Sequence, residues 1–277
     1  MNAYYFDTLP VHFQPHPGES FTSYLIRLAE ANGIQLVSQL FKMCFSKGRP
    51  GFTINTGDYP PRSFGALPTM TMCDPSDLLP TTFYYLAQKF SRRTEAQPVS
   101  QFMSGTLSPG LRYCPDCLTE RGYYALAWRF LNLEGCPDHG DRLLDHCQHC
   151  HQKIPLLSQP LRFGYCPICG HDLRRSQVER LSPLARQTAQ ACYQDLMFLL
   201  SPFSTEAVNR PLVEFMGEQL KRWRQVRRLK MVDAADYIEQ SIAMIYIMER
   251  GSEGRNAKLQ WYLVHRGVNK PSDIKLA

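Results

Sequence analysis

The sequence predicts a mainly α-helical chain with a compact, cysteine-rich middle. Apolar residues recur at helical spacing towards both ends of the 277 residues, and cysteine and histidine pairs crowd the stretch between positions 114 and 169. Hydrophobic residues make up 44% of the chain and charged residues 20%, so ordinary cores can form. We therefore expect three regions: N-terminal helices in 1–110, a cysteine-rich region in 111–175, and a C-terminal helical bundle in 176–277.

Residues 19–45 predict a helix, a short turn and a second helix. Ser20 is suited to cap the first helix, and Gly33 is suited to the left-handed residue that ends it. Such a helix-turn-helix-like unit can place its second helix in the major groove of DNA, although hairpins of this length more often serve packing alone. The second helix carries few bases, so DNA reading and protein contact both stay open.

The rest of the helical pattern is interrupted by one long irregular stretch. Residues 46–72 are rich in glycine and proline and predict a loop. Helical spacing of apolar residues predicts helices at 77–90, 183–200, 213–230 and 233–250. The last three would form the C-terminal bundle.

The predicted helix at 213–230 carries bases on one face. Residues 174–230 hold eleven Lys or Arg against five Asp or Glu, an excess that equals the formal net charge of +6 of the whole chain. A run of bases without an acid is either a solvated face or a surface for phosphate or an acidic partner, and both interpretations stay open. The bases on this face are Lys221, Arg222, Arg224, Arg227, Arg228 and Lys230.

Four close pairs of metal-ligand residues follow one another in the middle of the chain. They are Cys114 and Cys117, Cys136 and His139, Cys147 and Cys150, and Cys166 and Cys169. Two residues between ligands let a tight turn aim both side chains at one ion, and two such turns complete the tetrahedron that Zn²⁺ favours. The sequence therefore predicts two structural zinc sites in small zinc-ribbon-like modules.

The spacing of these pairs favours sequential pairing of the four turns. Eighteen residues separate the first pair from the second and fifteen separate the third from the fourth, as in zinc ribbons. A crossed arrangement, which joins the first pair to the third and the second to the fourth, is the alternative. It uses the same eight ligands.

The sequence contains no recognisable catalytic motif. A zinc site closed by four protein ligands has no position for water, and the chain lacks GxxxxGK[ST], HExxH, GxSxG and GxGxxG motifs. We therefore expect a protein that is not an enzyme. A zinc-containing nuclease is the competing hypothesis, and it would need a further cluster of acidic or histidine ligands.

The start of the chain has no apolar core of a signal peptide, and no stretch reaches the length of a membrane span. We expect a cytoplasmic protein without a membrane partner. Because that compartment keeps thiols reduced, the ten cysteines are expected to bind metal or to stay free.

Two groups of residues in this sequence resemble the TniQ family. The first group is His16, Pro17, Gly18, Glu19, Ser20, Ser23, Tyr24, Leu25, Arg27, Leu28, Ala29, Asn32 and Gly33. The second group is Arg112, Tyr113, Cys114, Pro115, Cys117, Trp128, Cys136, Pro137, His139, Gly140, Leu143, Leu144, Cys147 and Cys150. The resemblance covers residues 10 to about 175.

The resemblance implies a target-selection adaptor of a bacterial transposon. Such an adaptor links a targeting module to an AAA+ ATPase regulator of the TnsC kind, which recruits the transposase. The targeting module is either target DNA or a CRISPR effector complex with its guide RNA. Because the related TnsD selectors are usually much longer, we expect the adaptor class, which includes members from CRISPR-associated transposons. A sequence-specific DNA-binding selector that acts without a CRISPR effector is the alternative, and a homodimer stays open.

Overall fold

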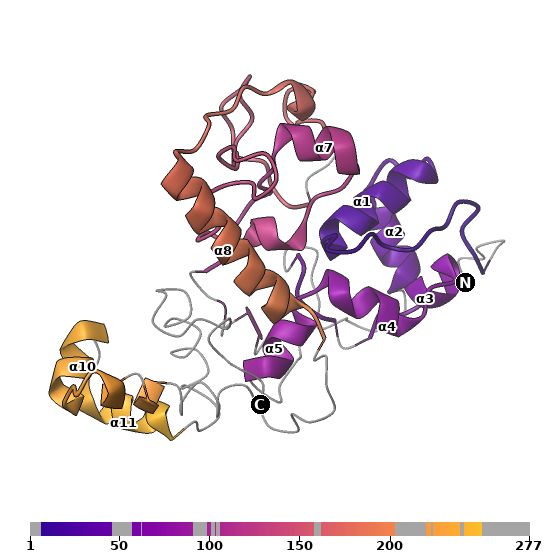
Figure 1. Cartoon of the computed structure of the whole chain (residues 1–277). Coiled ribbons are helices and arrows are strands. Elements are labelled where there is room, and N and C mark those ends of the chain that lie inside the picture. Colours follow the sequence, from indigo (N-terminus) through magenta and orange to yellow (C-terminus); the bar gives the residue numbers. More distant parts are fainter. Residues whose placement is uncertain are drawn as a thin grey trace.

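A computed structural model gives the fold of the chain (Figure 1). The structure describes residues 7–45, 57–61, 63–90, 99–100, 103, 106–157, 162–202, 220–222, 224–238 and 241–250. Its α-helices are α1 (Phe21–Ala31), α2 (Val37–Cys44), α3 (Leu67–Thr71), α4 (Pro75–Leu78), α5 (Tyr84–Phe90), α7 (Pro115–Arg121), α8 (Pro183–Leu200), α10 (Met231–Ile238) and α11 (Ile242–Glu249). Its 3₁₀ helices are η2 (Leu79–Thr81), η3 (Leu126–Arg129) and η4 (Leu173–Arg175). Within the described ranges only isolated antiparallel bridges occur in place of strands, so the predicted mainly helical class is confirmed.

Buried apolar side chains form two cores. The N-terminal core is built from residues 9–78 and packs α1, α2 and α3 together. The central core is built from residues 83–200 and joins α5, the cysteine-rich region and α8. The division of the chain at residues 110 and 175 stays a prediction. None of the described helices is long and apolar enough to cross a membrane.

The predicted helical hairpin at the N-terminus is present as α1 and α2. The Ser20 hydroxyl accepts the backbone N–H of Ser23 at 3.1 Å, as expected of the cap. Gly33 adopts a φ of +64° just after α1, where a side chain would be strained. Most of α1 is buried in the N-terminal core, whereas α2 buries Val37, Leu40 and Cys44 and leaves its other side to solvent.

The single helix predicted at 77–90 is wrong. The chain forms α4, the short η2 and α5 instead, because Pro80 cannot donate an N–H and Thr82 is extended, with a φ of −120°. A short helix, α3, also interrupts the stretch 46–72 that was predicted as a loop, of which residues 46–56 and 62 lie outside the described residues.

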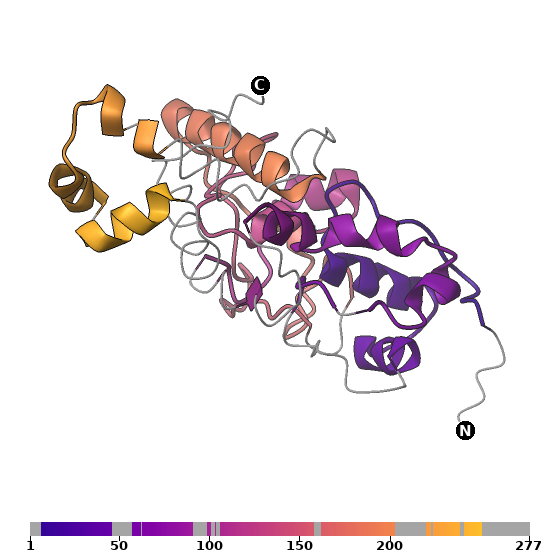
Figure 2. The same ribbon diagram turned by 90° about the horizontal axis from the view of Figure 1, so that it is seen from below.

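The C-terminal predictions were partly right. The helix predicted at 183–200 is α8, and Ser182 caps it by accepting the N–H of Ala185 at 3.3 Å. The single helix predicted at 233–250 is wrong, because α11 turns back against α10 and so buries Ile245 and two alanines of α10. Both views place α10 and α11 to one side of the other helices (Figures 1 and 2).

The predicted basic helix is shorter than expected at its C-terminal end. Residues 220–222 and 224–226 are helical, whereas 203–219 and 223 lie outside the described residues. Arg228 adopts a φ of +52°, and the Leu229 N–H donates to the Arg224 carbonyl at 3.0 Å, which closes the helix in a Schellman turn. Three of the six predicted bases, Arg227, Arg228 and Lys230, therefore follow the helix and do not lie on its face.

A buried ion pair joins the two cores. Asp58 is fully buried; one carboxylate oxygen accepts the N–H of Thr22 in the first turn of α1 at 2.7 Å, and the other pairs with the Arg129 guanidinium. Arg129 belongs to η3 and also donates to the carbonyl of Ser108 at 3.2 Å. The pair thus fixes the start of α1 against the central core.

Replacing Asp58 with alanine is expected to lower the free energy of unfolding by about 3–5 kcal/mol, because Arg129 would stay buried without its counter-charge. Urea unfolding followed by circular dichroism measures this loss. Asp7→Ala, at an exposed aspartate, serves as control and is expected to change stability by no more than about 0.5 kcal/mol. Equal stability of the two variants would contradict the role given to the pair.

Candidate metal centres

The structure brings the first two pairs of predicted ligands together. Cluster one consists of Cys114, Cys117, Cys136 and His139, whose donor atoms all lie within 4.8 Å of one another. The Sγ atoms of Cys117 and Cys136 are 3.4 Å apart. The Nδ1 atom of His139 lies 3.3 to 3.6 Å from the three sulfur atoms.

These separations fit a tetrahedral Zn²⁺ ion. Zinc–sulfur bonds of about 2.3 Å and zinc–nitrogen bonds of about 2.0 Å imply edges of roughly 3.8 Å between sulfurs and roughly 3.6 Å between sulfur and nitrogen. The other ring nitrogen of His139, Nε2, lies 3.1 Å from the Glu120 carboxylate. This contact fixes which nitrogen faces the cluster, as carboxylates commonly do for metal-bound histidines. Glu120 was not among the residues predicted from the sequence, although its place one turn after Cys117 on α7 is a usable signal.

The third and fourth pairs form a separate group. Cluster two consists of Cys147, Cys150, Cys166 and Cys169. Its sulfur atoms are 3.7 Å apart between Cys147 and Cys169 and 3.8 Å apart between Cys150 and Cys166, again close to a tetrahedral edge. The chain thus groups the pairs sequentially, and the crossed arrangement does not occur among the described residues.

Three of the four turns share one backbone geometry. In each, the residue after the second ligand donates its N–H at 2.9 Å to the carbonyl of the first ligand, from Gly140 to Cys136, from His151 to Cys147 and from Gly170 to Cys166. The donating residue has a φ of +74°, +57° and +73°, respectively. Glycine suits this left-handed position in the second and fourth turns, whereas His151 occupies it in the third at some strain.

The first turn differs from the other three because it starts a helix. Cys114 precedes Pro115, the first residue of α7, and Cys117 lies within the first helical turn. The Leu118 N–H donates to the Cys114 carbonyl at 3.0 Å. Proline at this position is suited to a helix start, since its missing N–H would have no partner there.

The thiols of cluster one perturb one another strongly. Hydrogen bonds from the Cys114 and Cys117 thiols lower the pKa of Cys136 far below its usual range. Contacts with Cys114 and Cys136, together with burial, raise the pKa of Cys117. Burial would lower the pKa of His139, but hydrogen bonds with Cys136 and Glu120 outweigh it and raise that pKa. Three buried thiols at this distance need a cation to ionise together, and a divalent metal supplies that charge.

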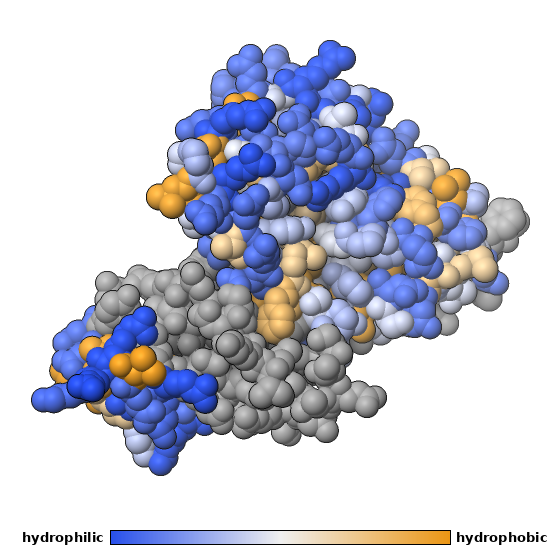
Figure 3. All heavy atoms as spheres, in the orientation of Figure 1, coloured by the Kyte–Doolittle hydropathy of each residue, from blue (hydrophilic) through white to orange (hydrophobic). Residues whose placement is uncertain are grey.

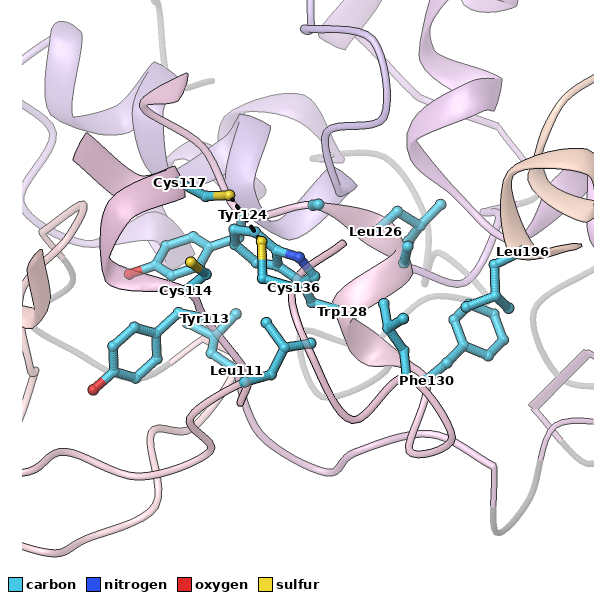
Figure 4. Packing of buried hydrophobic residues seen from close by; sticks show 14 of the residues in the cluster. Leu111, Tyr113, Cys114, Cys117, Tyr124, Leu126, Trp128, Phe130, Cys136 and Leu196 are labelled. Carbon is cyan, nitrogen blue, oxygen red and sulfur yellow. Dashed lines mark hydrogen bonds between the residues drawn. The ribbon is translucent and has the colours of Figure 1, made fainter. Parts of the chain in front are cut away.

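Cluster one is set into the edge of the central core. Its three thiols are fully buried, and Figure 4 shows them beside the rings of Tyr124 and Trp128. Arg112 holds the loop that leads to Cys136, because its guanidinium donates to the carbonyls of Phe130 at 2.6 Å and Leu133 at 2.8 Å.

Helix α8 holds the second turn from outside. The Arg186 guanidinium donates to the Asp138 carbonyl at 3.1 Å, and the Gln190 amide donates to the Pro137 carbonyl at 3.3 Å. Because Pro137 and Asp138 lie between the ligands Cys136 and His139, α8 and cluster one position each other. Neither side chain was predicted from the sequence, since nothing in the spacing of residues along α8 relates them to a turn about fifty residues earlier.

The sequence group that begins at His16 joins the helical hairpin to the central core. The Ser20 N–H donates to the Tyr124 carbonyl at 2.9 Å, and the Leu126 N–H donates to the Gly18 carbonyl at 2.9 Å. Glu19 is fully buried there and accepts hydrogen bonds from Ser23 at 2.8 Å and from Arg27 at 2.6 Å. This stretch therefore connects α1 to the chain segment that directly follows α7 of cluster one.

The six predicted bases differ in their surroundings. Arg224 is mostly buried and forms a bidentate ion pair with Glu249 of α11, at 2.5 and 2.8 Å. Its charge is already compensated within the chain. The other five are exposed, at least in part: Lys221, Arg222, Arg227, Arg228 and Lys230.

Together these features define a mainly helical protein with two clusters of four potential metal ligands each among its described residues. Residues 10–143, just under half of the chain, match the family model of TniQ, so this part of the chain is a TniQ domain. The match includes the helical hairpin and all of cluster one, and it ends before the first ligand of cluster two. A search of curated proteins found no match to this chain.

Gly140→Ala is expected to destabilise the protein more than Gly170→Ala. Both glycines have a left-handed φ, which costs other residues about 1–2 kcal/mol. A Cβ atom at Gly140 would also lie 2.9 Å from Cδ of Arg186, whereas none of the described atoms lies within 4 Å of one at Gly170. Displacing Arg186 would break its hydrogen bond to Asp138, which adds about 1 kcal/mol. Urea unfolding at fixed zinc concentration compares the variants, and equal losses would refute the contact between α8 and cluster one.

Proposed function

We propose that this protein is a non-enzymatic adaptor of transposition. A TniQ domain indicates a role in transposition target selection, and the TniQ family consists of non-catalytic adaptors. In the proposed role the chain links a targeting complex, which is a CRISPR effector with guide RNA or target DNA, to a TnsC-like AAA+ regulator and so to the transposase. The main observation behind this proposal is that residues 16–20 connect the helical hairpin to cluster one, whose first pair of ligands lies at the start of α7.

We propose that both clusters hold Zn²⁺ as a structural ion. Seven thiolates and one imidazole form the donor sets of the two clusters, and zinc is the usual ion for such sets. When bound, the ion supplies cross-links between chain segments too small to build a core of their own. In this proposal the eight ligands of the two clusters, with their ions bound, stabilise the fold of residues 111–175.

The closed donor sets favour an adaptor over a nuclease. Four protein ligands fill a tetrahedral ion, so neither site has a position at which water could be activated. Cluster one and cluster two are the two groups of potential metal ligands in the part of the chain that the structure describes. A two-metal nuclease site has no candidate ligands there.

The distribution of bases favours an adaptor over a selector that reads DNA alone. In α2, Lys42 is the single base, and Arg224 of the predicted basic surface is committed to Glu249. The exposed bases Lys221 and Arg222 are available for an acidic groove or a phosphate backbone. Contacts of that kind position a partner and carry no base specificity.

We expect zinc-dependent binding of this protein to a TnsC-like AAA+ regulator. Purified wild-type protein and Cys192→Ala, which alters a half-buried thiol outside both clusters, are expected to bind the ATP-loaded regulator equally. Cys136→Ala is expected to weaken binding at least about tenfold, because losing one ligand unfolds cluster one and frees the hairpin. Biolayer interferometry at matched salt measures the three affinities.

Gel shifts of the same preparations on candidate target DNA test the alternative. An adaptor is expected to bind weakly and without sequence preference, and its affinity should fall steeply with salt. A selector would prefer its target by about 10³-fold or more. If the protein shows that sequence preference and does not bind the regulator, the selector hypothesis is correct and the adaptor hypothesis is wrong.

A further inference from the structure

The two clusters differ in how far their sulfur atoms are exposed. In cluster one the thiols of Cys114, Cys117 and Cys136 are fully buried. In cluster two Cys169 is exposed and Cys150 is half-buried. The region that carries both clusters forms the upper part of the molecule in Figure 3, and its surface on this face is largely hydrophilic. A small polar reagent in water can therefore reach the sulfur of Cys169 directly.

The formal charge of the two clusters also makes cluster two the more reactive one. With Zn²⁺ bound, four thiolates leave cluster two with a charge of −2, whereas three thiolates and a neutral histidine leave cluster one with −1. The thiolate is the reactive form of cysteine towards oxidants and alkylating agents, and zinc binding keeps it deprotonated. Cluster two thus combines the higher electron density with the open approach.

We propose that Cys169 is a modification site of this protein, where peroxides and soft electrophiles attack, and that its oxidation closes a disulfide with Cys147 and releases the zinc ion of cluster two. This inference rests on the proposed zinc occupancy. The Sγ atoms of Cys169 and Cys147 are 3.7 Å apart, so a small movement brings them to the disulfide bond length of about 2 Å.

The chemistry balances with one hydrogen peroxide. The Cys169 thiolate attacks one peroxide oxygen, the O–O bond breaks, hydroxide leaves, and the sulfur is oxidised by two electrons to a sulfenic acid. The Cys147 thiolate then attacks that sulfur, the S–S bond forms, the S–O bond breaks, and a second hydroxide leaves. Zinc stays divalent and dissociates, because two of its four ligands are gone.

Loss of cluster two is expected to weaken contacts with the helical hairpin. The strip just before Cys166 touches α1 and the segment after α7: the Phe163 N–H donates to the Glu30 carboxylate at 3.1 Å, and the Gly164 N–H donates to the Tyr124 hydroxyl at 3.3 Å. The rings of Phe163 and Tyr124 also meet edge to face, with centroids 5.2 Å apart. Oxidation at Cys169 therefore weakens contacts that brace the TniQ domain.

The test treats the full-length, zinc-loaded chain with hydrogen peroxide and follows zinc release with a colorimetric chelator. The first zinc equivalent is expected to leave at least about tenfold faster than the second, because exposure controls access to the thiolate. Peptide mapping of alkylated samples is expected to find the Cys147–Cys169 disulfide while the thiols of cluster one are still reduced. Iodoacetamide without oxidant is expected to label Cys169 first.

Cys169→His is the matched variant, because it gives cluster two the Cys₃His donor set of cluster one and removes the exposed thiol. It is expected to keep two zinc ions and to release the first no faster than wild type releases the second. Cys192→Ser is expected to behave as wild type. Simultaneous release of both ions, earlier loss from cluster one, or an unmodified Cys169 would overturn the inference. Fewer than two zinc equivalents before oxidation would instead refute the proposed zinc sites.

Discussion

The convergence of three thiols and one imidazole in cluster one is the constraint on which the rest of this structure depends. Its first turn starts α7, and its second turn is gripped from outside by Arg186 and Gln190 of α8. The segment after α7 exchanges backbone hydrogen bonds with the start of the hairpin, because the Ser20 N–H donates to the Tyr124 carbonyl and the Leu126 N–H donates to the Gly18 carbonyl. Three elements far apart in the sequence are thus placed relative to one another by a group of four donors.

Residues of the TniQ domain that are not potential metal ligands also help to hold the helical hairpin in place. Glu19 is buried and forms an ion pair with Arg27, which stabilises the turn that leads into α1. Asp58 and Arg129 add a second buried link between the hairpin and the central core. These links suit the proposed adaptor role, because a surface that is already ordered loses less entropy when it binds. Cluster two lies beyond the matched segment, and its exposed sulfur distinguishes it from the buried cluster one.

Local chemistry made part of this structure predictable. The sequential grouping of the ligands followed from their spacing, and the hairpin and α8 followed from apolar periodicity and from caps at Ser20 and Ser182. Apolar periodicity gave wrong predictions where proline or long-range packing determines the structure. It predicted one helix across Pro80, and it predicted one helix in place of α10 and α11, which pack against each other. The roles of Asp58 and Arg186 depend on partners distant in sequence, so no local pattern could reveal them, whereas the place of Glu120 one turn after Cys117 on α7 was a usable signal. Arg224 looked like a surface base for the same reason.

We propose that seven sulfur atoms and one histidine nitrogen close two zinc sites, and zinc K-edge X-ray absorption on the purified chain tests this directly. We expect an average first shell of three and a half sulfurs and half a nitrogen per zinc, because seven sulfurs and one nitrogen are divided over two ions, with zinc–sulfur distances of about 2.3 Å. A shell dominated by oxygen or nitrogen at about 2.0–2.2 Å would contradict it.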